Sequence, residues 1–219
     1  ARTKLLMDAA NRGLIAENGL WMLVAQAKEA AEWFTNSVIS DEKISEIYEI
    51  LRSQMENIVL IGMPASGKTT VGRMLAEATG RPFIDLDDEI VTLAGKDIPS
   101  IFRDEGEEGF RNLESETVRI AAQTTGAVIA TGGGIVKRGE NISLLHQNGK
   151  ILYLDCPTDE LPVTPDRPLS SSREAIEELH RTRHPLYTAA ADAVIAISHK
   201  NEFKNNANEV LKIFSEMII

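Results

Sequence analysis

Cysteine and long apolar runs are both nearly absent from the sequence. Cys156 is the single cysteine in 219 residues, which excludes an internal disulfide framework and fits a reducing compartment. No apolar run approaches the roughly 18 residues of a membrane-spanning helix, and the first residues lack the apolar core of a secretory signal. We therefore expect a cytoplasmic protein that does not enter a membrane.

Positive charge is also scarce. Lysine and arginine number 23 against 33 acidic residues, a formal net charge of −10. This balance excludes a general nucleic-acid footprint, so any anionic ligand must be held by locally placed cations. The histidines at 146, 180, 184 and 199 are scattered, and we assign them no metal site. Hydrophobic residues make up 43% of the chain, enough for a buried core.

The stretch from Gly62 to Thr70 reads GMPASGKTT and has the spacing of a phosphate-binding loop. It follows an apolar run at 58–61 and precedes a helical pattern. Glycines let successive backbone N–H groups turn inward around phosphate oxygens, and the helix adds the positive end of its dipole. Lys68 can reach between the outer phosphates, and the Thr69 hydroxyl can ligate a bridging Mg²⁺. The stretch therefore predicts a nucleotide-phosphate site.

Apolar runs and helical patterns alternate from residue 57 onward, whereas the first 56 residues read as helices alone. Such alternation is typical of a parallel sheet with helices on both faces, in which ligands gather beyond the carboxyl ends of the strands. We therefore expect a helical segment at 1–56 and an α/β domain at 57–219. The predicted strands are 58–61, 83–86, 127–130, 151–154 and 193–197, and the predicted helices of the second part are 67–79, 107–123, 140–147, 173–189 and 202–217.

Acidic residues cluster where the second predicted strand ends. Asp85 and Asp87 are two residues apart, so on an extended backbone both face the space above the sheet. One carboxylate could hold a Mg²⁺-bound water while the other orients a substrate hydroxyl. Capping of the next helix explains the same letters. Because the cluster follows a phosphate-binding loop, we favour the ligand role.

Three further segments carry groups suited to an anionic ligand. Arg111 and Glu114 are three apart on a helix and can pair, which would fix the guanidinium for a carboxylate or phosphate; an ordinary surface ion pair is the alternative. Glycines at 132–134 would let a ligand approach the main chain, or would form only a flexible hinge. Arg167, in a polar loop at 157–172, would neutralise charge on a migrating phosphoryl group or remain solvated.

Arg181 and Arg183 add a second source of positive charge for an anionic ligand. The alternative is that they lie on the solvated face of a helix.

Taken together and in this order along the chain, the motifs of residues 57–219 resemble those of shikimate kinase, a P-loop enzyme of the nucleoside-monophosphate-kinase type. The resemblance implies a three-layer fold around a five-stranded parallel sheet, and ATP-dependent phosphorylation of the 3-hydroxyl of shikimate in the pathway to chorismate. The matching motifs are GMPASGKTT, DLD at 85–87, GEEGFRNLE at 106–114, TGGG at 131–134, RPL at 167–169 and RHPLY at 183–187.

The resemblance also implies a role for each matching residue. The catalytic residues would be Lys68, Asp87 and Arg167. Shikimate would bind to Asp87, Arg111, Gly133 and Arg183, with the two arginines around its carboxylate and Asp87 on its ring hydroxyls. Thr69 and Asp85 would hold Mg²⁺. The nucleotide phosphates would contact Ala65, Ser66, Gly67, Lys68, Thr69, Thr70 and Arg167.

The first segment resembles a different enzyme of the same pathway. NGLWMLVAQAKEAAEWF at 18–34, with TKLLMDAANRG before it, is similar to the final helices of shikimate 5-dehydrogenase. Gln26 matches a glutamine that helps bind shikimate in that family. The alternative is that these residues are apolar core positions of a helix, which would account for the similarity without any ligand. The resemblance implies that the chain is covalently continuous with a dehydrogenase domain in a longer polypeptide, and that no dehydrogenase activity remains in the present part.

The polar loop before the last helices departs from the family pattern. A basic residue usual shortly before Arg167, where family members pack an arginine on adenine, is replaced by a stretch with Asp159, Glu160, Pro162 and Pro165. This stretch therefore does not specify the base of the nucleotide. Two rival functions stay open, namely a kinase of another small hydroxy acid such as gluconate, and a catalytically silent nucleotide-binding module fused to a dehydrogenase.

Overall fold

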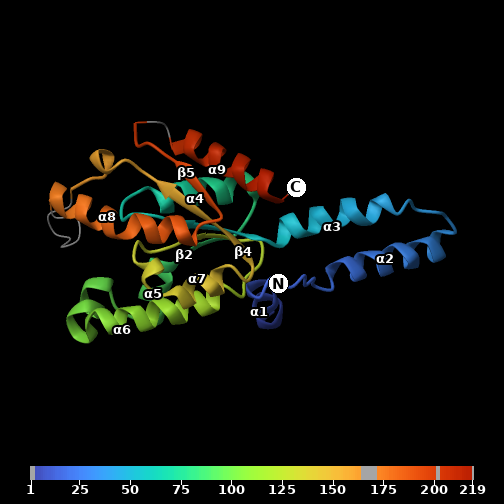
Figure 1. Cartoon of the computed structure of the whole chain (residues 1–219), viewed down its shortest axis with the longest axis horizontal. Helices are drawn as coiled ribbons and strands as arrows, with labels where there is room; N and C mark the ends of the chain where they lie inside the picture. Colours follow the sequence, from blue (N-terminus) through green and yellow to red (C-terminus); the bar gives the residue numbers. More distant parts are fainter. Residues whose placement is uncertain (1–2, 164–171, 201–202, 219) are drawn as a thin grey trace.

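The computed structural model of the chain describes residues 3–163, 172–200 and 203–218. Five parallel strands form one sheet in the order β2–β3–β1–β4–β5, and helices lie on both of its faces (Figure 1). The predicted α/β fold with a five-stranded parallel sheet is confirmed. The strands are β1 (Asn57–Ile61), β2 (Phe83–Asp85), β3 (Val128–Ala130), β4 (Gly149–Asp155) and β5 (Ala193–Ala196). The helices are α1 (Lys4–Asn11), α2 (Leu20–Thr35), α3 (Glu42–Met55), α4 (Lys68–Thr79), α5 (Leu86–Ala94), α6 (Ile98–Ala121), η1 (Ile135–Lys137), α7 (Gly139–Leu145), η2 (Thr158–Glu160), α8 (Arg173–Ala190) and α9 (Phe203–Ile218).

β1 is the central strand, which explains why its sequence is uniformly apolar after Asn57. Leu60 pairs with Ala130 of β3 on one side and with Leu152 of β4 on the other. All four residues at 58–61 have no exposed surface. A strand covered on both faces needs apolar residues at every position rather than at alternate ones. The phosphate-binding loop therefore begins from the best-packed strand of the sheet.

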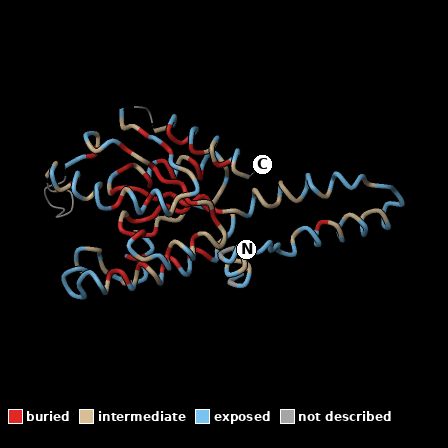
Figure 2. Tube along the Cα trace, viewed as in Figure 1, coloured by how far each residue is buried: buried red, intermediate tan, exposed pale blue. Residues whose placement is uncertain are grey.

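The helices form two outer layers around this sheet. α4 and α9 pack against each other on one face, and α6 and α7 lie together on the other (Figure 1). α8 contacts β4 and η1. Figure 2 shows the buried residues concentrated between these layers. The loops that follow β1, β2, β3 and β4 consequently meet at one edge of the sheet, as parallel strands require.

The sequence prediction missed α5 and the first half of α6. The predicted helix at 107–123 begins instead at Ile98, where Asp97 caps the helix by accepting a hydrogen bond from the Ser100 backbone N–H at 2.8 Å. Gly106 interrupts it with a left-handed φ of 71°. α5 and α6 share a small core of their own, made by Ile90, Ile101 and Phe110.

α2 and α3 form a hairpin that projects from the α/β part (Figures 1 and 2). α3 packs on α2, with the rings of Trp21 and Tyr48 5.3 Å apart. The end of α3 is tied to the sheet layer, because the Arg81 guanidinium donates to the backbone oxygens of Ser53 and Glu56 at 2.6 Å each. None of the helices in the described residues combines the length and apolarity that a membrane span requires.

Candidate active site

The phosphate-binding loop joins β1 to α4 in a tightly curled path. Gly62, Ala65 and Gly67 have positive φ angles of 148°, 61° and 89°. A Cβ atom on Gly62 would lie 2.7 Å from the backbone oxygen of Leu154 in β4, so only glycine fits there. The loop is therefore shaped by close contact with the neighbouring strand as well as by its own turns.

Lys68 lies inside the mouth of this loop, with 7% of its surface exposed. Its Nζ donates to the backbone oxygens of Met63 at 2.7 Å and Gly62 at 3.1 Å. Burial lowers the pKa of Lys68 to about 8, while the charges of Asp87 and Asp85 oppose that shift. Lys68 is thus a buried amino group whose hydrogen-bond partners are neutral backbone oxygens. An anionic partner would stabilise its positive charge more strongly.

The Asp85 carboxylate accepts hydrogen bonds from both α4 and α5. The Thr69 hydroxyl donates to its Oδ2 at 2.7 Å, and its Oδ1 accepts from the Asp87 backbone N–H at 3.1 Å. Asp85 therefore caps α5, the alternative that the sequence left open. The expectation that Asp85 and Asp87 share an extended backbone is wrong, because the helix already begins at Leu86 and Asp87 lies in its first turn. The two carboxylates nevertheless both act on Lys68.

Arg111 and Glu114 form a buried ion pair rather than a surface pair. Their side chains are 9% and 2% exposed, and Arg111 Nη1 donates to both carboxylate oxygens at 2.8 and 2.7 Å. Burial raises the pKa of Glu114, and the contact with Arg111 opposes that rise. A Cβ atom on Gly134 would overlap the Arg111 guanidinium. The glycines after β3 thus make room for a fixed cation at the edge of the sheet.

Gly133 anchors α8 to the loop after β3. Its backbone oxygen accepts a hydrogen bond from Arg183 Nη1 at 2.8 Å and another from the Tyr187 hydroxyl. Arg183 is 4% exposed, whereas Arg181 points to solvent and pairs with Glu178 at 2.7 Å. Of the two arginines that the sequence singled out on this helix, only Arg183 lies at the site.

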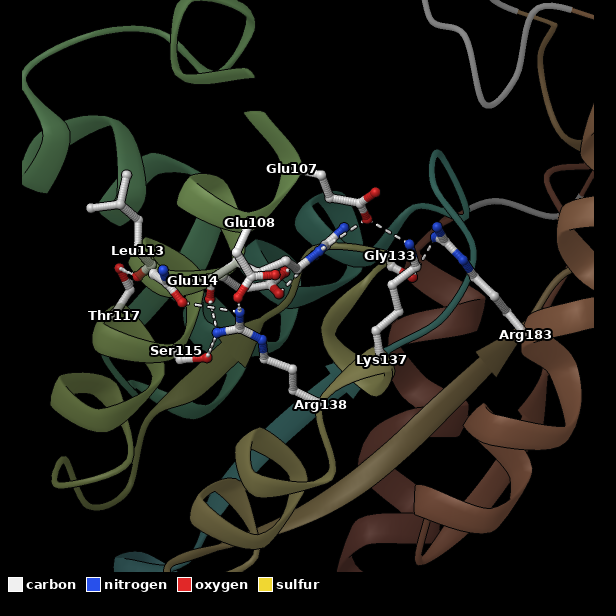
Figure 3. A network of polar contacts seen from close by, with 12 residues as sticks. Glu107, Glu108, Leu113, Glu114, Ser115, Thr117, Gly133, Lys137, Arg138 and Arg183 are labelled. Atoms are coloured by element: carbon white, nitrogen blue, oxygen red, sulfur yellow. Dashed lines mark hydrogen bonds and ion pairs between the residues drawn. The ribbon is translucent and has the colours of Figure 1, made fainter. Parts of the chain in front are cut away.

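Figure 3 shows a network of polar contacts that includes Glu107, Lys137 and Arg138. Arg138 Nη1 donates to the Arg111 backbone oxygen at 2.9 Å, and Lys137 pairs with Glu107 at 2.6 Å. Glu107 in turn lies 3.6 Å from Arg111 Nε. Sequence reasoning missed Lys137 and Arg138, although two consecutive basic residues just beyond the glycines were a visible signal. They fasten the start of the second half of α6 to the loop after β3.

The polar loop at 157–172 is described only at its two ends, and Arg167 lies outside the described residues. At its start, the Glu160 carboxylate accepts from the Ser198 hydroxyl at 2.7 Å and from the His199 backbone N–H at 2.8 Å. These bonds lower the pKa of Glu160 to about 2. Glu160 therefore fastens the start of the loop to the segment after β5.

Two of the histidines that the sequence analysis describes as scattered lie together in the structure. His180 and His184 are four residues apart on α8, and their side chains meet Asp155 at the end of β4. Helix periodicity places such residues on one face, a spacing that the sequence analysis overlooked.

A parallel five-stranded sheet whose central strand runs into a G-x-x-x-x-G-K-T loop and a helix defines a P-loop nucleotide-binding protein. The family model of shikimate kinase matches residues 64–217. The chain belongs to the shikimate kinase family.

Individual relatives agree with this assignment. The shikimate kinase of Dechloromonas aromatica is 43% identical over 150 residues, covering 65% of this chain and 82% of the relative. That of Clostridium beijerinckii is 39% identical over 160 residues, covering 71% and 93%. Among solved structures, the shikimate kinase from Acinetobacter baumannii in complex with shikimate is similar, with a TM-score of 0.71, 33% identity, and coverage of 77% of this chain and 98% of that one. The enzyme from Aquifex aeolicus has a TM-score of 0.63 at 31% identity, covering 73% of this chain and 96% of that one.

Proposed function

We propose that the chain transfers the γ-phosphoryl group of ATP to the 3-hydroxyl of shikimate, giving ADP and shikimate 3-phosphate. Membership of the shikimate kinase family supports this reaction, as does similarity to a solved relative that holds shikimate. The observation that carries the proposal is the pair of buried arginines, Arg111 and Arg183, at the same edge of the sheet as Lys68. A buried guanidinium there suits a ligand with its own carboxylate.

The nucleotide is proposed to lie with its phosphates on the phosphate-binding loop. Backbone N–H groups at 65–70 and the amino end of α4 would bind phosphate oxygens. Lys68 would exchange its backbone partners for phosphate oxygens, which compensate a buried positive charge better than neutral carbonyl groups do. Arg167, from the loop beyond the described residues, is proposed to add positive charge near the migrating group.

Thr69 and Asp85 are the residues proposed to hold Mg²⁺. A hydroxyl and a carboxylate oxygen 2.7 Å apart are donors of the hard oxygen type that this cation prefers. Mg²⁺ would neutralise charge on the phosphates when bound there with ATP.

Shikimate is proposed to bind between the loop after β3 and the first turn of α5. Arg111 and Arg183 would hold its carboxylate, and Gly133 would contact it through the main chain. Asp87 would accept a hydrogen bond from the 3-hydroxyl and aim its oxygen at the γ-phosphorus. The proximity of Asp87 to Lys68, visible in its effect on the lysine pKa, supports a short path between hydroxyl and phosphate.

The reaction then needs alignment more than covalent help from the protein. The 3-hydroxyl oxygen forms a bond to the γ-phosphorus as the bond from that phosphorus to the β–γ bridging oxygen breaks. The hydroxyl proton passes toward Asp87, while Lys68 and Arg167 stabilise negative charge on the transferred group.

ADP release measured with shikimate or gluconate as acceptor, together with the mass of the product, tests the function. We expect turnover with shikimate and a product heavier by one phosphoryl group. Turnover with gluconate alone would favour a kinase of another hydroxy acid. Binding of ATP and shikimate without ADP release would indicate a silent module.

We also propose that residues 1–56 form a unit separate from 57–219, in which residues up to about 36 end a shikimate dehydrogenase domain of a longer polypeptide and the helix after them is a linker. Ile15, Trp33, Phe34 and Val38 are each about nine-tenths exposed or more, which supports burial against a segment outside this sequence. An immunoblot of the source cells should detect a polypeptide clearly larger than the 24.0 kDa of this chain. A single band at that mass would contradict the fusion.

A further inference from the structure

A cluster of two histidines and one carboxylate lies outside the site described above. His180 and His184 are on successive turns of α8, with stacked rings 4.8 Å apart. Asp155 ends β4, and its Oδ1 lies 3.7 Å from His180 Nε2 and 3.9 Å from His184 Nδ1. One ligand atom from each of the three residues lies within 4.8 Å of the other two. The two elements of the fold thus bring three potential metal ligands to one point.

The donor set decides which cations would suit this point. Two imidazole nitrogens and one carboxylate oxygen are ligands of Zn²⁺ and its neighbours in the first transition row, whereas Mg²⁺ and Ca²⁺ prefer oxygen ligands alone. Bonds of about 2.1 Å in a tetrahedral site put ligand atoms about 3.4 Å apart. The distances of 3.7 and 3.9 Å from Asp155 Oδ1 to the two imidazole nitrogens are less than 1 Å longer than that, a difference that small side-chain rotations cover.

The cluster is accessible and already partly organised. The side chains of His180, His184 and Asp155 are 27%, 40% and 32% exposed, so an ion can reach them from solvent. The Tyr153 hydroxyl donates to Asp155 Oδ1 at 2.8 Å and lies 3.1 Å from His184 Nδ1. These contacts hold Asp155 and His184 beside each other, and an ion bound to the same two atoms would replace the Tyr153 hydroxyl there.

We propose that Asp155, His180 and His184 bind one divalent transition-metal ion, of the Zn²⁺ type, which joins α8 to the carboxyl end of β4. The ion would lie beside the substrate edge without belonging to it. Arg183 precedes His184 in the chain, and Tyr187, one turn further along α8, stacks on Tyr153 at 5.0 Å. Binding would therefore restrain the helix that carries Arg183. This site differs in place and in donor type from the proposed Mg²⁺ site at Thr69 and Asp85.

Calorimetric titration of the chelator-treated chain with ZnCl₂, in excess Mg²⁺, tests the proposal. We expect one ion per chain, with affinity lowered at least about tenfold in His180→Gln, because one of three protein ligands is lost. His146→Gln is the matched control, since His146 also lies beside a carboxylate, 3.4 Å from Asp192, but outside the cluster. This control should bind Zn²⁺ as the unchanged chain does.

Titration of the unchanged chain with CoCl₂ gives a readout that does not depend on any variant folding correctly. Tetrahedral coordination by nitrogen and oxygen should produce an intense visible absorption at one equivalent, and ZnCl₂ should abolish it by displacement. The proposal is overturned if no ion binds in excess Mg²⁺, or if His146→Gln loses as much affinity as His180→Gln.

Discussion

The buried pair of Arg111 and Glu114 should respond very differently to removal of one partner or the other. In Glu114→Gln, the guanidinium of Arg111 keeps its charge at every accessible pH but loses both short contacts with the carboxylate. Another acidic neighbour, Glu107, lies 3.6 Å from Arg111 Nε and is half exposed. Breaking a buried pair in this way costs about 3 to 5 kcal/mol of unfolding free energy.

Removal of Arg111 instead leaves the Glu114 carboxyl group, which can lose its charge by binding a proton. In Arg111→Met, the buried Glu114 loses the contact that holds its pKa down, so burial alone raises that pKa further above 4.5, its ordinary value. A carboxyl group whose pKa is higher in the folded state binds more protons there. Folding stability is therefore retained below the unfolded pKa and falls as pH rises toward the folded value. Arg111→Met should be clearly less stable at pH 8 than at pH 5, relative to the unchanged chain.

Urea unfolding at these two pH values measures both effects. Glu114→Gln should lose stability at both, with a melting temperature lower by roughly 10 °C for a chain of this size. Glu178→Gln is the matched control, because Glu178 pairs with Arg181 at the same three-residue spacing but in solvent, where such pairs contribute about 0.2–1 kcal/mol. A loss below about 1 kcal/mol in Glu114→Gln, or no pH dependence in Arg111→Met, would refute the reasoning.

Three other outcomes follow from the site. Lys68→Met should abolish turnover without lowering the melting temperature, because it removes a buried cation whose pKa is already depressed to about 8; retained turnover would contradict the role of the loop. ATP binding at pH 9 should take up about one proton, because the negative phosphates raise the pKa of Lys68 again. Calorimetry in buffers of different ionisation enthalpy detects this uptake, and equal heats in all buffers would exclude it. Gly134→Ala should raise the KM for shikimate severalfold, because its methyl group displaces the Arg111 guanidinium, whereas an unchanged KM would remove Arg111 from the substrate site.

Much of the fold was predictable because the strong signals are local. The apolar run at 58–61, the glycine and lysine spacing after it, and the alternation of elements suffice to predict a parallel sheet with a phosphate-binding loop at its carboxyl edge. α5 was missed because it begins at Leu86, directly where β2 ends, with no connecting loop to mark the change of structure. The change of Asp87 from strand to helix depends on one capping hydrogen bond from its own backbone N–H, which residue letters alone do not specify.

The sequence indicated candidate site residues but did not specify the contacts among them. The three-residue spacing of Arg111 and Glu114 predicts a pair, but its burial depends on Gly134 and on Phe110, whose ring lies 5.0 Å from the guanidinium. The cluster of His180, His184 and Asp155 joins residues about 30 positions apart through the packing of α8 on β4. Spacing along one helix was visible in the sequence, whereas the third ligand required the tertiary fold.

A crystal structure with shikimate and a non-hydrolysable ATP analogue tests the central claim most directly. The account predicts phosphates on the loop around Lys68, the shikimate carboxylate between Arg111 and Arg183, and the 3-hydroxyl between Asp87 and the γ-phosphorus, with oxygen and phosphorus about 3 to 3.5 Å apart. Shikimate bound away from both arginines, or a 3-hydroxyl turned away from the phosphate, would contradict it.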